Sequence, residues 1–293
     1  MTTQFTRGKL HTYADPAEMA RVARALRAVG NKIALVPTMG ALHAGHRELL
    51  RRAGRVPNAV LAASIFVNPL QFGPGEDFDR YPRTMAEDID VCERARVELV
   101  FTPQRDRLFS PGSQVRVWPG PLGDELEGAH RPGHFAGVLT VVAKLFNIVR
   151  PDYAFFGEKD YQQLVLIRRM VADLDMDVSV IGVPTVREPD GLALSSRNAY
   201  LDAERREQAV ALSAALAAGA HAARDGAGAV LDAAHGVLAA WPDVVVDYLE
   251  LRAPDLGDAP AAGEARLLVA AKVGQTRLID NAPVLLGPVE REG

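Results

Sequence analysis

The sequence contains almost no cysteine: Cys92 is the only one among its 293 residues. A single cysteine cannot form a disulfide within the chain, so a scaffold held together by disulfides is excluded. Chains without disulfides are typical of the reducing cytoplasm, where we expect this protein to act. Because free cysteines are among the most buried residue types, we expect Cys92 to be a small apolar residue on a helix.

Long apolar runs are also missing. No apolar run is long enough to cross a membrane, and residues 1–9 contain no apolar core of the kind found in signal peptides. We therefore expect neither a membrane span nor secretion. The formal net charge is only −4, which argues against a broad surface for nucleic acid or for an anionic membrane.

The sequence lacks the H-E-x-x-H and C-x-x-C spacings that mark common zinc sites. It does contain a glycine-bearing segment at residues 37–46, between an apolar run at 33–36 and a helical pattern at 48–53. This order predicts strand, turn and helix, an arrangement in which α/β folds bind phosphate. The unpaired main-chain N–H groups at the start of a helix carry partial positive charge, so they attract the phosphates of a nucleotide.

His43 and His46 lie one helical turn apart in this segment, so both rings can face one ligand. The pair alone leaves three interpretations open: a nucleotide site, a zinc site, or ordinary polar residues at a helix start. A zinc site needs three or four ligands at recognisable spacing. A second segment, LSSRN at residues 194–198, favours the nucleotide, because two hydroxyls and a planar guanidinium suit phosphate oxygens.

Up to residue 185, apolar runs alternate with helical patterns. We expect strands at 33–36, 60–67, 99–101, 153–156 and 178–183, and helices at 16–29, 48–53, 84–95, 135–149 and 162–174. Strands that alternate with helices predict an α/β fold, in which a parallel sheet carries helices on both faces. The ligand crevice of such a sheet lies at the carboxyl ends of its strands.

The composition changes near residue 185. Residues 202–240 are rich in alanine and follow a helical pattern that Asp202 would cap, with a helix boundary at 226–229. Residues 244–251, 267–273 and 277–279 then alternate like a small antiparallel sheet. We therefore expect two domains, an α/β domain at residues 1–185 and a smaller α+β domain at residues 186–293.

Polar side chains follow two further predicted strands. Lys159 comes after the strand at 153–156, where a cation would meet phosphates. The alternative is that it is a solvated surface lysine. Asn68 and Gln71 follow the strand at 60–67. Their uncharged amides suit a substrate with hydroxyls and a carboxylate, and the alternative is that they cap the loop.

Two charged groups are less informative. The acidic residues at 87–90 lie in the first turns of a predicted helix, where carboxylates already complement the helix dipole. This role is favoured over ligation of magnesium. His130, Arg131 and His134 either meet phosphates or are ordinary loop residues.

Four motifs closely resemble those of the pantothenate synthetase (pantoate–β-alanine ligase) family. They are VPTMGALHAGH at 36–46, SIFVNPLQF at 64–72, FFGEKDYQQ at 155–163 and DGLALSSRN at 190–198. The first and last are also similar to the HIGH and KMSKS signatures of the nucleotidyltransferase superfamily. The resemblance implies a Rossmann-like domain with a smaller C-terminal lid domain, a homodimer and a magnesium-dependent reaction in two steps. Pantoate and ATP give pantoyl adenylate and pyrophosphate, and β-alanine then displaces AMP to give pantothenate.

The resemblance also implies which residues contact ATP. These are Met39, Gly40, Ala41, Leu42, His43, Ala44, Gly45, His46, Gly157, Glu158, Lys159, Asp160, Val186, Leu194, Ser195, Ser196 and Arg197. His46 is the implied proton donor. The chemistry of His43, Lys159 and Arg197 adds them to the catalytic group, because cations and imidazoles can neutralise the leaving pyrophosphate.

Pantoate is the implied ligand of Gln71 and Gln163, and Gln71 would also border the β-alanine site. We add Asn68 to this substrate site because of its amide. Asp88 is the one side chain expected to approach Mg²⁺, although ATP phosphates and water could equally hold the ion.

Three other functions differ from this one in testable ways. An enzyme that adenylylates a phosphate would need further cations, where this sequence has the amides Gln71 and Gln163. A tRNA-charging enzyme is disfavoured by the acidic charge balance and the small C-terminal domain. A nucleotide-sensing module would not turn ATP over to AMP. For the homodimer, the apolar runs at 60–67 and 139–145 are candidate interface segments.

Overall fold

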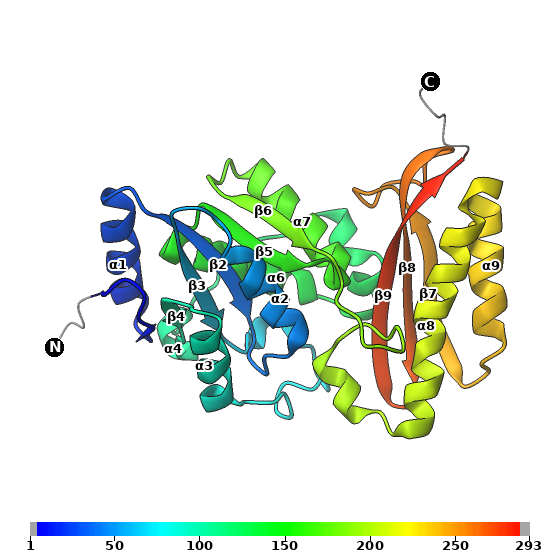
Figure 1. Cartoon of the computed structure of the whole chain (residues 1–293), viewed down its shortest axis with the longest axis horizontal. Coiled ribbons are helices and arrows are strands. Elements are labelled where there is room, and N and C mark those ends of the chain that lie inside the picture. The colour runs from blue at the N-terminus through cyan, green and yellow to red at the C-terminus, as the bar shows by residue number, and fades with distance from the viewer. Residues whose placement is uncertain (1–4, 288–293) are drawn as a thin grey trace. The chain divides into compact units, whose positions relative to one another are not determined.

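A computed structural model describes residues 5–287 of the chain. Its elements are labelled in Figure 1 and belong to two compact units. Unit 1 contains the described residues up to Gly157 together with Leu166–Pro184. Unit 2 contains Glu158–Val165 and the described residues from Thr185 onward. The domain division predicted after residue 185 stays a prediction.

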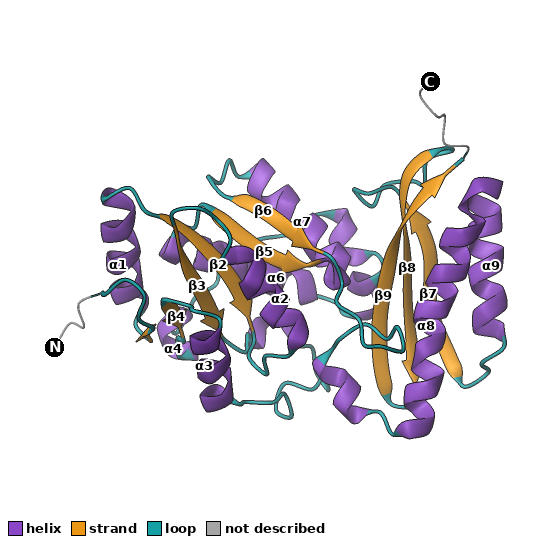
Figure 2. Ribbon diagram, in the orientation of Figure 1, coloured by secondary structure: helices purple, strands orange, loops and turns teal. Residues whose placement is uncertain are grey.

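Unit 1 contains a six-stranded sheet in the order β1-β4-β3-β2-β5-β6, in which all neighbours are parallel (Figure 2). The strands are β1 (His11–Tyr13), β2 (Lys32–Thr38), β3 (Ala59–Ile65), β4 (Leu99–Phe101), β5 (Tyr153–Gly157) and β6 (Ser179–Val183). The predicted parallel sheet is confirmed. Strand β1 was not predicted, because a three-residue edge strand with two polar residues has no apolar pattern.

The order of the strands reverses at β2. Strands β3 and β4 follow on one side of it, and β5 and β6 lie on the other. At such a switch point the loops after the two neighbouring strands diverge and leave room for a ligand. Strand β2 ends at Thr38 and β5 ends at Gly157, so two of the four sequence motifs cross this edge of the sheet.

Helices cover both faces of this sheet. The helices that begin in unit 1 are α1 (Pro16–Ala28), α2 (Ala44–Ala53), α3 (Met85–Arg94), α4 (Arg105–Leu108), α5 (Glu127–His130) and α6 (His134–Val149). Helix α7 (Tyr161–Asp173) begins in unit 2 and ends in unit 1. Ala34 and Val36 of β2 pack with α2 and α3, whereas α1 and α6 contact β2 and each other. Alternate residues of a strand point to opposite faces, which explains why all of 33–36 is buried.

Cys92 lies on α3 and is fully buried, as predicted. Burial, together with the nearby negative charge of Asp88, raises the pKa of its thiol to about 12. The thiol is therefore neutral and acts as a packing group.

The two runs predicted as interface candidates are covered within unit 1. Strand β3, which includes most of 60–67, lies between β4 and β2 and is almost entirely buried. In α6, every residue from 139 to 145 except Lys144 is buried. Packing within the unit accounts for the hydrophobicity of both runs, so neither is an exposed surface for a partner.

Unit 2 contains an antiparallel sheet in the order β7-β8-β9 and two longer helices, as predicted. The elements are α8 (Ala203–His221), α9 (Ala227–Ala239), β7 (Val244–Arg252), β8 (Gly263–Val273) and β9 (Thr276–Leu286). The side chain of Asp202 caps α8, and Gly226 precedes α9. Strands β8 and β9 are longer than predicted because buried polar residues interrupt their apolar pattern.

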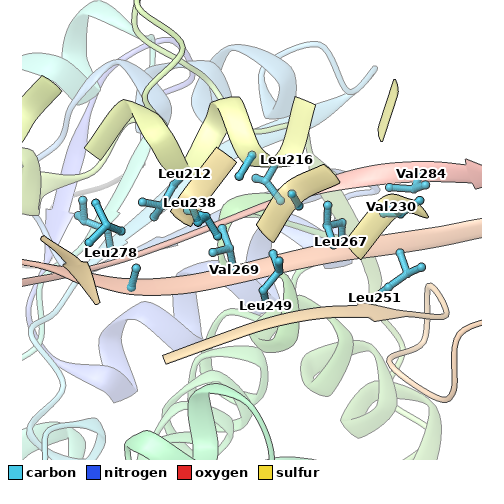
Figure 3. Packing of buried hydrophobic residues seen from close by; sticks show 14 of the residues in the cluster. Leu212, Leu216, Val230, Leu238, Leu249, Leu251, Leu267, Val269, Leu278 and Val284 are labelled. Carbon is cyan, nitrogen blue, oxygen red and sulfur yellow. The ribbon is translucent and has the colours of Figure 1, made fainter. Parts of the chain in front are cut away.

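One apolar core holds unit 2 together. Figure 3 shows leucine and valine side chains of α8 and α9 packed against the sheet. The labelled residues are Leu212, Leu216, Val230 and Leu238 on the helices, and Leu249, Leu251, Leu267, Val269, Leu278 and Val284 on the strands. The two helices and one face of the sheet thus form the core of unit 2.

Short 3₁₀ helices connect the longer elements. They are η1 (Pro69–Gln71), η2 (Pro121–Asp124), η3 (Glu158–Asp160), η4 (Ser196–Tyr200) and η5 (Ala222–Asp225). None of the described helices has the length and apolar character that a membrane span requires.

Candidate functional site

The turn between β2 and α2 is fixed by hydrogen bonds to the carboxylate of Asp88, which lies on another helix. The N–H groups of Ala41 and Leu42 donate to Asp88 Oδ2 and Oδ1 at 3.0 and 2.7 Å. Asp88 belongs to α3 and is 2% exposed, and Thr84 Oγ1 also donates to it at 3.3 Å. A carboxylate that accepts main-chain N–H groups in a buried position makes strong hydrogen bonds. Asp88 therefore fixes the course of the turn.

The turn can pass this close to Asp88 only because residue 40 is glycine. Gly40 has φ +90°, and a Cβ atom there would lie 2.9 Å from Asp88 Oδ2. Ala41 adopts φ +51°, an uncommon conformation for a residue with a side chain. The hydrogen bonds to Asp88 offset this local cost.

The two histidines of the motif form a capping box at the start of α2. His43 is the N-cap residue, and its Nδ1 accepts from Gly45 N–H at 3.1 Å, while His46 Nδ1 accepts from His43 N–H at 3.2 Å. A ring nitrogen that accepts a hydrogen bond carries no proton, so both neutral rings carry their hydrogen on Nε2. The ring centroids are 4.2 Å apart. The cap thus sets both tautomers and makes Nε2 the donor atom of each ring.

Gln71 lies beside this turn. Its Nε2 is 3.1 Å from Met39 Sδ, and its Oε1 accepts from Asn68 Nδ2 at 3.0 Å. Asn68 also donates to Gly137 O and accepts from Leu70 N–H. Asn68 therefore caps η1, which is one of the two predicted roles, and the substrate role of the pair stays a prediction.

A chain of hydrogen bonds from His134 to Arg131 and Glu76 supports the main chain of Gln71. His134 donates from Nδ1 to Gln71 O at 2.8 Å, and Arg131 donates from Nη1 to His134 Nε2 at 3.1 Å. Arg131 Nη2 in turn donates to Glu76 Oε2 at 2.6 Å. These contacts require the neutral His134 tautomer with hydrogen on Nδ1. Sequence reasoning left Arg131 and His134 open and missed Glu76, because no local pattern links positions 76 and 131.

The pKa of His134 is lowered to about 4, mainly by burial and then by the charge of Arg131, while the Gln71 carbonyl and the charges of Glu76 and Glu127 act in the opposite direction. For Glu76, burial acts to raise the pKa, but the hydrogen bonds and charge of Arg131 outweigh it, so the carboxyl pKa is lowered. The group therefore contains a neutral imidazole between an ion pair and a main-chain carbonyl.

The remaining predicted residues lie in unit 2, apart from Gly157 at the end of β5. Lys159 in η3 has Nζ 3.7 Å from Asp160 Oδ1 and is mostly buried. Gln163 follows in the first turn of α7 and is half-buried.

The second hydroxyl-bearing motif forms a folded loop. Leu194 N–H donates to Val186 O at 2.9 Å, so two predicted nucleotide contacts that are eight residues apart lie side by side. Ser195 Oγ accepts from Arg197 N–H at 3.3 Å and caps η4. Ser196 and Arg197 follow in this 3₁₀ helix and are half-buried.

A metal site built from protein side chains has little support. Between residues 5 and 287 there is no group of three or more His, Cys, Asp or Glu side chains that could hold an ion. Both oxygens of Asp88 accept main-chain N–H groups.

A family model described as pantoate-beta-alanine ligase matches residues 11–283. The chain is 68% identical to the pantothenate synthetase of Saccharopolyspora erythraea, over 97% of this chain and 94% of that protein. It is 62% identical to the pantothenate synthetase of Mycolicibacterium smegmatis, over 98% of this chain and 91% of that protein.

Solved structures show the same fold. The pantothenate synthetase of Thermus thermophilus superposes with a TM-score of 0.87 at 44% identity, covering 95% of this chain and all of that one. A pantoate-beta-alanine ligase from Francisella tularensis, complexed with beta-gamma ATP and beta-alanine, gives a TM-score of 0.77 at 32% identity. That match covers 93% of this chain and 97% of the other.

We predict that Asp88→Asn lowers the free energy of unfolding by about 2 kcal/mol, because an amide can accept from only one of the two N–H groups and opposes the other. Urea denaturation measures the change. Asp90→Asn, at an exposed position on the same helix, is the matched control and is expected to change little. Equal stability of the two variants would contradict the role given to Asp88.

We also predict that His134 makes stability depend on pH between about 6.5 and 4. The unfolded chain binds a proton near pH 6.5, whereas folded His134 binds one only near pH 4. Its neutral form therefore contributes stability that is present above pH 6.5 and lost as the pH falls, by at most about 3 kcal/mol.

The test compares wild type with His134→Gln by urea denaturation at pH 7 and pH 4.5. The stability difference between them should shrink at the lower pH. His235→Gln, at an exposed position on α9, is the control and should show no such change. A constant difference for His134→Gln would show that folding does not lower the pKa of this imidazole.

Proposed function

The chain belongs to the pantoate-beta-alanine ligase family and catalyses the ATP-dependent condensation of pantoate with β-alanine, and we propose that this reaction proceeds through a pantoyl adenylate. One carboxylate oxygen of pantoate attacks the α-phosphorus, and the bond to the bridging oxygen breaks as pyrophosphate leaves with the electron pair. The neutral amine of β-alanine then attacks the acyl carbon. AMP leaves, and the nitrogen loses a proton as the amide of pantothenate forms.

The observation that carries this proposal is the contact between Gln71 and Met39. The Gln71 amide, which we assign to pantoate, lies against the turn that we assign to ATP, and both belong to unit 1. This contact would bring pantoate and ATP together in a step that does not involve β-alanine. In this proposal Gln71 and Gln163 bind pantoate, while Asn68 orients the side-chain amide of Gln71 by donating to its Oε1. A carboxylate held next to the α-phosphorus needs no strong base, so positioning accounts for most of the rate.

For ATP, we assign the residues at 39–46, 157–160 and 194–197 together with Val186. His43 and His46 would donate from Nε2 to phosphate oxygens, since their Nδ1 atoms accept main-chain N–H groups. Lys159 and Arg197 would neutralise the charge that develops on pyrophosphate. His46 is assigned as the proton donor on the family resemblance, and a hydrogen on its Nε2 is compatible with that role.

Magnesium enters this proposal only as a companion of ATP. The Asp88 carboxylate does not fit the role of a ligand well, because its oxygens already accept two N–H groups and a hydroxyl. We therefore propose that phosphate oxygens and water hold Mg²⁺, which seldom has an all-protein cage. Asp88 shapes the turn instead.

We further propose a homodimer that acts in the cytoplasm. The single cysteine supports the compartment. Support for a partner surface comes from the segment 111–120, where Val115 and Trp118 are 87% and 69% exposed. Large apolar side chains exposed close together favour an interface over open solvent.

The adenylate mechanism predicts exchange of labelled pyrophosphate into ATP. Exchange should occur with pantoate and magnesium present and β-alanine absent, because it requires a reversible acyl-adenylate step. Pantoate labelled with ¹⁸O in its carboxylate should then pass one label to AMP when β-alanine is added. Label in inorganic phosphate, or no exchange without β-alanine, would rule out the adenylate.

The histidine assignment predicts that His43→Asn slows this exchange by roughly 10²- to 10³-fold without loss of stability. Asparagine is a preferred N-cap residue and its Oδ1 replaces the Nδ1 acceptor, but it lacks the Nε2–H donor. His46→Asn is expected to behave likewise. His235→Asn on α9 is the control, and near-normal exchange in both motif variants would remove the proposed role.

A further inference from the structure

Two adjacent polar residues, Asp280 and Asn281, are buried in the middle of β9. They are 4% and 3% exposed. A buried polar group needs hydrogen-bond partners to offset the loss of water. The partners of both side chains lie in unit 2 and include Glu158 and Lys159, which we assign to ATP, and Arg187, which is next to Val186.

Asn281 holds the main chain of η3. Its Nδ2 donates to the carbonyl oxygens of Glu158 and Lys159, both at 2.9 Å. Its Oδ1 accepts from Arg266 Nε at 2.7 Å. Both amide hydrogens are used on consecutive carbonyls, a pattern that a carboxylate could not make because it has no hydrogen to donate.

Arg266 completes this contact from β8. Its Nη2 donates to Glu158 Oε2 at 3.0 Å, and its guanidinium carbon lies 4.0 Å from the centre of the Tyr161 ring. Tyr161 in turn donates from its hydroxyl to Pro254 O at 2.9 Å. The segment that carries Lys159 is thus bound at two carbonyls, one carboxylate and one ring. This explains why residues 158–165 pack with unit 2, although the strand before them belongs to unit 1.

Asp280 makes a parallel contact to the other segment. Arg187 donates from Nη1 and Nη2 to the two oxygens of Asp280 at 2.5 and 2.9 Å. The same guanidinium donates to Gly191 O and Asn281 O. Arg187 directly follows Val186, whose carbonyl accepts from Leu194 N–H. A two-pronged contact of this kind fixes direction as well as distance.

We propose that Asp280 and Asn281 are positioning residues that hold both ATP-binding segments of unit 2 on one strand. Asn281 holds the η3 turn that carries Lys159, and Asp280 holds Val186 and Leu194 through Arg187. The proposal rests on the assignment of these segments to ATP. Because neither side chain touches a substrate in it, changes here act through geometry, and a small misplacement of a reacting group costs up to about 10²-fold.

The test is Asn281→Asp, which keeps the shape and the acceptor for Arg266 but removes both N–H donors. The KM for ATP in the condensation reaction should rise tenfold or more, while the KM values for pantoate and β-alanine stay within twofold. The matched control is Asp247→Asn on β7, also an acid–amide exchange, at a half-buried position paired with an arginine, Arg277. The control should leave all three KM values unchanged.

A second measurement does not depend on catalysis. Backbone hydrogen exchange of residues 158–165, followed by mass spectrometry, should speed up in Asn281→Asp and not in Asp247→Asn. If Asn281→Asp does not fold, Arg187→Lys takes its place. It keeps the charge but loses the two-pronged contact, and the KM for ATP should rise with faster exchange at 186–194.

An unchanged KM for ATP overturns the proposal, whether or not hydrogen exchange changes, because an anchor that leaves ATP unaffected is only structural. An equal rise in all three KM values, or in the Asp247→Asn control, overturns it as well. Failure of the adenylate mechanism would appear separately, as a wild-type enzyme that shows no pyrophosphate exchange without β-alanine.

Discussion

The hydrogen bonds from the turn after β2 to Asp88 are the constraint on which the rest of unit 1's site depends. They reach from α3 to a turn 46 residues earlier in the chain and leave that turn no freedom at Ala41 and Leu42. The start of α2 follows directly, so the position of His43 is set by the same contact. In many α/β folds this turn presents its N–H groups to phosphate. Here Asp88 accepts two of these N–H groups inside the protein, and in the proposed function the imidazoles donate to phosphate in their place.

The histidines show how capping and chemistry can share one group. As N-cap and N3 residues, His43 and His46 satisfy main-chain donors at the start of α2. The same hydrogen bonds assign the proton of each neutral ring to Nε2. If these rings bind phosphate as proposed, their donor atoms are set in advance by the cap, which is the condition for effective electrostatic stabilisation.

In both units, buried polar residues support residues that we assign to the substrates. In unit 1, His134 holds the carbonyl of Gln71, and Asn68 holds its side-chain amide. In unit 2, Asn281 holds the carbonyls of Glu158 and Lys159. Main-chain contacts of this kind leave the neighbouring side chains available for chemistry while fixing where they start. Asn68, His134 and Asn281 therefore position residues that we assign to the substrates.

The sequence alone determined the parallel sheet, the antiparallel sheet of unit 2, the cap at Asp202 and the motifs that carry the family chemistry, because these depend on local periodicity and on short spacings. It determined that Cys92 is a buried packing residue. It did not determine the role of Asp88 or the supports at His134 and Asn281, and it mistook 60–67 and 139–145 for exposed surfaces. Hydrogen bonds between residues roughly 40 to 120 positions apart cannot be predicted from local sequence patterns. An apolar run has the same pattern whether it packs against its own chain or against a partner. Only the tertiary structure decided these points, because it brings β9 to η3 and α3 to the turn after β2.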